Sequence, residues 1–163
     1  MNYRIATIDD LEKVWDKDIA RHIDDQNWKR WKSEYIDYNK NHEAITFVAE
    51  DNDDIIAQIS VVFKNNVKAV LGKPFLVDFE TVNMNGFRCD KNYEGHGHIS
   101  KLVKMGEEYA KSLGYKYSTI GANAKNTRNL QIYFHFGYTQ FLKAIEELEG
   151  NSMATVLYYK KEL

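Results

Sequence analysis

The first forty residues combine one strand pattern with helix patterns. Residues 3–6 alternate between apolar and polar side chains, as a short strand does. Thr7 and Asp10 then have the spacing of a capping pair at a helix start. The apolar residues that follow recur every three or four positions: Leu11, Val14, Trp15 and Ile19. This spacing predicts an amphipathic helix directly after the first strand.

An aromatic stripe marks a second predicted helix. Its members fall at i, i+3, i+7 and i+10, on one helical face: Trp28, Trp31, Tyr35 and Tyr38. Asp24 or Asp25 is expected to cap this helix. The stripe has two interpretations, packing in the core or the lining of a binding pocket.

Two apolar runs in the middle of the chain, 44–50 and 54–63, predict paired strands. The polar segment DNDD between them has the composition of a hairpin turn. The region 64–73 has no clear pattern and is either a mobile loop or an extra strand. Residues 75–90 form a long strand-like run, in which Gly86 predicts a bulge.

Helix and strand patterns alternate in the second half of the chain. The third predicted helix has one apolar face: Ile99, Leu102, Val103, Gly106 and Leu113. Strands are predicted at 115–122, 138–145 and 153–160, and a short helix over 126–136. The resulting order, β-α-α-β-β-β-α-β-α-β-β, predicts an α/β (α+β) fold with a central mixed sheet and helices on both faces.

Composition and charge narrow the functional classes. The chain has 163 residues, 44% of them hydrophobic, and is expected to form one domain over 1–163. A net charge of −2 without a run of Lys or Arg argues against nucleic-acid binding. No segment approaches the roughly 20 apolar residues of a membrane span, and the N-terminus lacks the apolar core of a signal peptide. Cys89 is the only cysteine, so we expect a cytoplasmic protein without disulfides.

A glycine-containing turn, NYEGHGH, separates the 75–90 run from the third helix. Gly95 and Gly97 allow the backbone to turn tightly and to approach a ligand. The free N–H groups at the start of the helix attract anions, and His96 and His98 offer further donors. The P-loop pattern is absent, and Ser100 stands where the dinucleotide fingerprint requires a glycine. The turn is therefore either a pyrophosphate site of another kind or a plain tight turn.

Two segments resemble the motifs of the GNAT acetyltransferases. YEGHGHISKL is similar to the family's Tyr-Arg-Gly-x-Gly-x-Gly/Ala-x-x-Leu motif, with four matching positions: Tyr93, Gly95, Gly97 and Leu102. About thirty residues later, NTRNLQIYFHFGY is similar to Asn-x-x-Ala-x-x-x-Tyr-x-x-x-Gly-Phe, with three: Asn126, Tyr133 and Gly137. Two motifs at the family's spacing are more specific than either alone.

The resemblance implies a GNAT fold, with a mostly antiparallel mixed sheet of six or seven strands, and acetyl-CoA as co-substrate. It implies that backbone groups of Phe87 and Cys89 contact the pantetheine arm and that the turn holds the pyrophosphate. The turn residues are Glu94, Gly95, His96, Gly97, His98 and Ile99. Asn126 would hydrogen-bond the cofactor, and Tyr133 would protonate the leaving thiolate.

Acetyl transfer to an amine needs a base, because a protonated amine cannot attack a thioester. The family often keeps a carboxylate on the strand upstream of the turn, which makes Glu80 the candidate, with Asp78 or a water chain as alternatives. A backbone N–H of that strand is the expected oxyanion donor. The sequence departs from the motifs at Glu94, Ile99 and Asn129, where the family has Arg or Gln, Gly or Ala, and alanine.

Two other functions stay open at the sequence level. One is a catalytically weak or inactive acyl-CoA sensor, and the other is an interaction protein built on the aromatic stripe. His96 and His98 lack a third ligand at a useful spacing, so no metal is expected. No base accompanies Cys89 as a nucleophile. The expected acceptor is a small-molecule amine or a peptide N-terminus, bound by the first two helices, residues 64–74 and the last hairpin. A homodimer is compatible with the resemblance.

Overall fold

The computed structural model describes residues 1–163 and contains a seven-stranded sheet with four α-helices. The strands are β1 (Asn2–Ile5), β2 (Ala44–Asp51), β3 (Asp54–Val62), β4 (Thr81–Cys89), β5 (Tyr117–Asn123), β6 (Gln140–Glu149) and β7 (Ser152–Glu162). The helices are α1 (Ile8–Arg21), α2 (Asn27–Lys40), α3 (His98–Ser112) and α4 (Thr127–His135). This order confirms the predicted succession of strands and helices.

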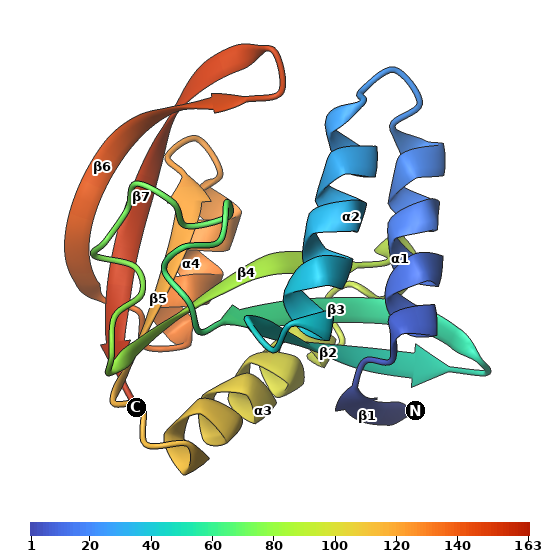
Figure 1. Ribbon diagram of the computed structural model, residues 1–163, viewed down its shortest axis with the longest axis horizontal. Helices are drawn as coiled ribbons and strands as arrows, with labels where there is room; N and C mark the ends of the chain where they lie inside the picture. Colours follow the sequence, from blue (N-terminus) through green and yellow to red (C-terminus); the bar gives the residue numbers. More distant parts are fainter.

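The strands lie in the order β1-β2-β3-β4-β5-β7-β6 (Figure 1). All neighbouring strands are antiparallel except β4 and β5, which run parallel. The sheet is therefore mixed and mostly antiparallel, as predicted. The last strand, β7, lies between β5 and β6, so β6 forms an edge of the sheet.

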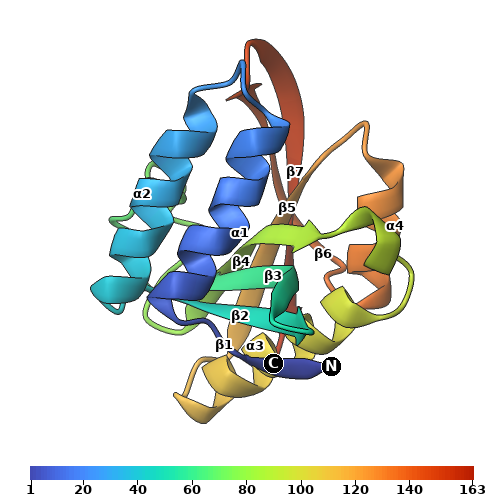
Figure 2. The ribbon, with the colours of Figure 1, turned by 90° about the vertical axis from the view of Figure 1, so that its right-hand side faces the viewer.

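The helices cover both faces of the sheet (Figures 1 and 2). Helices α1 and α2 pack on one face, where Leu11 and Trp15 belong to a buried cluster with Tyr158 of β7. Helices α3 and α4 pack on the other face, where Leu102 and Tyr133 belong to a second buried cluster. Each face of the sheet thus has its own hydrophobic core.

The starts of α1 and α2 differ in how they are capped. The capping box predicted for α1 is confirmed: the Asp10 N–H donates to Thr7 Oγ1 at 3.2 Å, and the Thr7 N–H donates to Asp10 Oδ2 at 2.7 Å. The cap predicted for α2 is wrong, because Gln26 is the N-cap and makes no side-chain capping bond. Asp25 still accepts a hydrogen bond from the Asn27 N–H at 2.9 Å.

The β2–β3 hairpin and the bulge in β4 follow the sequence prediction. Asn52 and Asp53 adopt φ values of 50° and 64°, which suit a tight two-residue turn. Gly86 has a φ of 66°, and the pairing register shifts opposite it, between Gln58 and Ser60 of β3. A bulge of this kind re-aims the residues that follow it along the strand.

The segment 63–80 departs from the prediction. The strand expected over 75–90 begins only at Thr81, because residues before it form turns closed by Leu76 N–H to Lys73 carbonyl (3.0 Å) and by reciprocal Asp78–Thr81 bonds. Region 64–73, left open as a loop or a strand, contains no strand. Four apolar side chains of the segment are instead buried in the core shared with α2 and the β6–β7 hairpin, Val67, Val70, Leu76 and Val77, whereas Leu71 and Phe79 are exposed.

Candidate functional site

Strands β4 and β5 diverge after a short paired stretch. Their pairing covers only Thr81–Asn83 against Tyr117–Thr119, whereas β4 stays paired with β3 as far as Cys89. From residue 84 onward, the edge of β4 that faces away from β3 has no strand partner. A ligand lying between the two strands can use these backbone groups as hydrogen-bond partners.

Phe87 and Tyr133 meet on the α3/α4 side of this divergence. Their ring centres are 5.4 Å apart, although they come from β4 and α4. Tyr133 is only 6% exposed, and burial raises its pKa to about 12. Its hydroxyl therefore keeps its proton at neutral pH and acts as a donor. Cys89 lies two residues beyond Phe87 on the same side of β4, partly buried against the same core.

The turn after β4 has its backbone open to solvent. Gly95 and Gly97 adopt φ values of 77° and 81°, in the left-handed region that favours glycine. No atom lies within 4 Å of the position that a Cβ would take at either residue. Gly97 is the N-cap of α3 without a side-chain capping bond, so the first amides of the helix point outward unpaired. The turn thus offers room and hydrogen-bond donors to an anion.

The charged and aromatic residues of the turn have different surroundings. His96 is exposed, with Nδ1 donating to the Tyr93 carbonyl at 3.2 Å. The ring of His98 is buried and lies 2.8 Å from the Tyr3 hydroxyl, so it contacts β1 and is not presented to an anion at the turn. The Glu94 carboxylate pairs with Arg128 of α4 at 3.6 Å. Ile99 packs against the α3/α4 core.

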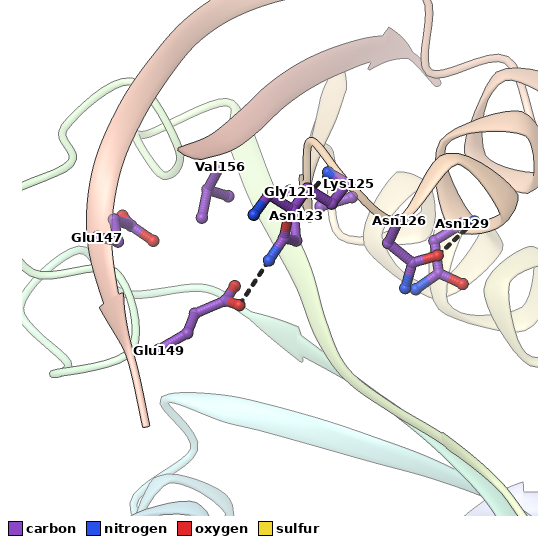
Figure 3. A pocket seen from close by; sticks show the side chains of 9 residues that line it. Gly121, Asn123, Lys125, Asn126, Asn129, Glu147, Glu149 and Val156 are labelled. Atoms are coloured by element: carbon purple, nitrogen blue, oxygen red, sulfur yellow. Dashed lines mark hydrogen bonds between the residues drawn. The ribbon is translucent and has the colours of Figure 1, made fainter. Parts of the chain in front are cut away.

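Asn126 begins α4. Its Oδ1 accepts a hydrogen bond from the Asn129 N–H at 3.1 Å, which makes it the helix N-cap. Both asparagines line an open cavity, shown in Figure 3. The side-chain amide of Asn126 is therefore placed beside the end of β5, while its oxygen already has a structural partner.

Glu80 and Asp78 lie at the wrong end of β4 for the proposed base. The Glu80 carbonyl accepts hydrogen bonds from the amides of Lys116 and Tyr117, and its carboxylate is 3.6 Å from Lys116 Nζ. Seven residues of extended chain separate it from Phe87, which corresponds to about 20 Å. Asp78 belongs to the turn that precedes the strand. The structure therefore does not bring either carboxylate to Tyr133.

The α1/α2 face of the diverging strands carries polar groups that the sequence analysis missed. The Tyr35 hydroxyl donates to Asn85 Oδ1 at 2.6 Å, and Asn85 Nδ2 donates to Asn83 Oδ1 at 2.9 Å. Asn83 in turn contacts Thr119 of β5 at 3.1 Å. The alternation of two asparagines with apolar residues in β4 was the signal that could have identified this polar row.

An open cavity of about 640 Å³ lies at the ends of β5, β6 and β7. Its lining comes from strands and from α4: Gly121, Ala122, Asn123, Lys125, Asn126, Asn129, Glu147, Glu149 and Val156. Figure 3 shows the carboxylates of Glu147 and Glu149 on β6, with Glu149 accepting a hydrogen bond from Asn123 at 2.8 Å. Neither glutamate was identified from the sequence, because acidic residues on an exposed hairpin are common.

A family model described as the acetyltransferase (GNAT) family matches residues 7–138 of the chain. This chain belongs to the GNAT acetyltransferase family. The matched region includes both motifs, the diverging strands β4 and β5, and the turn that leads into α3. No match is found among curated proteins by sequence.

Solved structures of acetyltransferases share the GNAT fold of this chain. A ribosomal-protein-alanine N-acetyltransferase from Brucella melitensis has a TM-score of 0.75 and 13% identity, with 100% of both chains covered. A putative acetyltransferase from Salmonella typhimurium, solved with its cofactor acetyl-CoA, has a TM-score of 0.73 and 12% identity, covering 99% of this chain and 93% of that one. A mutant spermidine N-acetyltransferase from Vibrio cholerae has a TM-score of 0.72 and 12% identity, covering 99% and 95%.

The GNAT family uses acetyl-CoA, and the residues of this chain fit it. The glycine turn and the α3 N-terminus suit a pyrophosphate, and the unpaired edge of β4 suits the amides of a pantetheine arm. No group of three or more His, Cys, Asp or Glu side chains is arranged to hold a metal ion. None of the four helices is long and apolar enough to cross a bilayer.

Proposed function

We propose that this GNAT protein transfers the acetyl group of acetyl-CoA to a primary amine. The observation that carries the proposal is the contact between Phe87 and Tyr133 beside the unpaired edge of β4. The contact supports a role for Tyr133, whose hydroxyl keeps its proton, beside the strand along which the pantetheine arm is expected to lie. The thioester sulfur would then end within reach of that hydroxyl.

The cofactor is held mainly by backbone groups. Amides of the turn from Glu94 to Ile99 bind the pyrophosphate, and backbone groups of Phe87 and Cys89 bind the pantetheine arm. The side chain of Asn126 donates to the cofactor from the start of α4. Neither departure from the motif, at Glu94 or at Ile99, removes a backbone amide, so we expect both to be compatible with cofactor binding.

The chemistry is a direct transfer. The uncharged amine attacks the thioester carbonyl carbon, and a backbone N–H of β4 stabilises the oxyanion. The nitrogen of the intermediate releases its extra proton to water, the carbon–sulfur bond breaks, and the thiolate takes the hydroxyl proton of Tyr133. The products are an N-acetylated amine and CoA, and Tyr133 regains a proton from solvent.

The amine loses its proton to water in this proposal. Glu80 and Asp78 are too far along β4, and the polar row of Tyr35, Asn85 and Asn83 offers hydrogen bonds but no carboxylate. These groups can order a water chain that carries the proton away from the α1/α2 face.

The acceptor enters from the α1/α2 side. The similar structures include an enzyme named for spermidine and one named for a protein alanine, and both names describe amine acceptors. We propose an acceptor of the same chemical class. The aromatic stripe of α2 contributes its two tyrosines to the core, so the helix supports this side and does not form a separate binding surface.

A thiol-release assay tests the proposal. Purified protein is incubated with acetyl-CoA and a panel of monoamines, diamines and peptides, and free CoA is followed colorimetrically. Turnover with an amine, together with mass-spectrometric detection of the acetylated product, supports the enzyme. Calorimetric binding of acetyl-CoA without turnover supports the acyl-CoA sensor instead, and no binding contradicts both.

A further inference from the structure

Lys73 places an ammonium group at the carboxylate of Glu147. Its Nζ lies 2.8 Å from Glu147 Oε1 and 6.0 Å from the ring centre of Tyr158. Lys73 belongs to the irregular segment between β3 and β4, whereas its two partners belong to the β6–β7 hairpin. A carboxylate combined with an aromatic ring is the composition of a binding site for an organic ammonium ion.

Tyr158 fixes the Glu147 side chain. It is 5% exposed, and its hydroxyl donates to Glu147 Oε1 at 2.7 Å. Burial and this hydrogen bond raise the pKa of Tyr158 above its usual range, so it remains a donor. Lys73 and Tyr158 both contact Oε1, so an incoming ammonium group at this carboxylate competes with Lys73.

This ammonium site lies where β4 and β5 separate. The Tyr158 ring covers Gly121, because a Cβ at that position would be 2.5 Å from Tyr158 Cε1. Gly121 is two residues beyond Thr119, the last residue of β5 that pairs with β4. Tyr158 belongs to the α1/α2 core and Tyr133 to the α3/α4 core, so the two tyrosines approach the divergence from opposite faces.

The Glu147 carboxylate also belongs to the lining of the cavity in Figure 3. Glu147 and Glu149 supply two negative charges to its lining, and Lys125 supplies the one positive charge. The side chain of Asn123 holds Glu149 in place. Lys73, which pairs with Glu147 from outside this lining, balances the second negative charge, so the cavity becomes net negative and suited to another cation when Lys73 is displaced.

We propose that Glu147 and Tyr158 bind an ammonium group of the acceptor, in competition with the chain's own Lys73. This inference rests on the proposed function. The reacting nitrogen must be uncharged when it attacks, whereas the nitrogen at Glu147 must be charged to bind there. The two roles need two nitrogens, so the acceptor is a diamine or a longer oligoamine.

Steady-state kinetics with a matched pair of amines tests the proposal. The amines are 1,4-diaminobutane and 1-aminobutane, at saturating acetyl-CoA. Glu147→Gln is expected to raise KM for the diamine about tenfold, because a charge-assisted hydrogen bond is lost, with little change in kcat or in KM for the monoamine. Lys73→Met is expected to lower KM for the diamine several-fold, because Glu147 loses its internal partner.

Glu146→Gln is the control, because Glu146 is exposed on the same strand and bonds Thr155 outside the cavity lining. Thermal melting verifies that each variant is folded.

The proposal is overturned if Glu147→Gln affects both amines alike or neither, or if Lys73→Met raises KM for the diamine. If no amine is acetylated, the proposed function fails, and calorimetry with 1,4-diaminobutane decides the inference separately. Binding that Glu147→Gln weakens supports it, and the absence of binding to the unmodified protein contradicts it.

Discussion

The Glu94 carboxylate lies 3.6 Å from the Arg128 guanidinium. Glu94 belongs to the glycine turn and Arg128 lies in the first turn of α4, so the ion pair joins the two segments that carry the family motifs. It also gives Glu94 a positive partner beside the proposed pyrophosphate site. The negative charge of Glu94, which by itself would oppose binding of a pyrophosphate, is therefore balanced by Arg128 in the folded protein.

Replacing Arg128 and replacing Glu94 should change acetyl-CoA affinity in opposite directions. Arg128→Gln leaves Glu94 unpaired near the pyrophosphate and should weaken binding about two- to fivefold, whereas Glu94→Gln should strengthen it by a similar factor. These factors match the roughly 0.2–1 kcal/mol of an exposed ion pair. Calorimetry at low salt measures both, with exposed Lys104→Gln as the control. Tighter binding by Arg128→Gln would contradict the prediction.

Tyr133→Phe should reduce kcat by one to two orders of magnitude without changing acetyl-CoA affinity, because only proton donation to the thiolate is lost. Since the pKa of Tyr133 is raised to about 12, its ionisation should not lower the rate between pH 7 and 10. Tyr159→Phe is the matched control, because Tyr159 packs against Phe134 and Phe141 with ring contacts that phenylalanine can keep. Equal rates for the two variants would remove Tyr133 from the acid role.

Gly97→Ala should weaken acetyl-CoA binding at least fivefold. An alanine at φ 81° costs about 1–2 kcal/mol of strain, and the turn should relax to a shape that misplaces its amides. Gly114→Ala is the control, because Gly114 has a φ of 93° with equally open surroundings, beyond the other end of α3. Both variants should lose similar stability in urea unfolding, but only Gly97→Ala should lose affinity. Equal affinities would show that the turn does not hold the cofactor.

Asp10 should make folding stability depend on pH in the acid range. The hydrogen bond from Arg4 lowers the pKa of the buried Asp10 to about 2 in the folded protein, from an unfolded value near 4. The ionised carboxylate therefore contributes about 2 kcal/mol above pH 4, and this is lost as the pH falls from 4 toward 2. Urea unfolding from pH 2 to 7 should show this slope for the native sequence and for exposed Asp9→Asn. For Asp10→Asn the slope should be much reduced, and an unchanged slope would contradict the assignment.

The sequence determined the features that depend on short segments of chain. Thr7 and Asp10 are three residues apart, so the start of α1 could be read from them directly. The hairpin at Asn52–Asp53 and the bulge at Gly86 were equally local, because they depend on the conformations that those residues tolerate. The two motifs and their spacing were enough to predict the family and the fold.

The tertiary structure decided which distant residues meet. The sequence made Glu80 the candidate base. In the fold, Glu80 lies beside the end of β4 that pairs with β5, whereas Phe87 lies near the other end of β4. Residues 75–80 have the pattern of a strand, yet they form a loop whose Leu76 and Val77 side chains are buried in a cluster with residues of β7. Lys73 meets Glu147 only because β7 and β6 lie beside β5. A local pattern records which side chains are apolar or charged, whereas their partners depend on strand order and register.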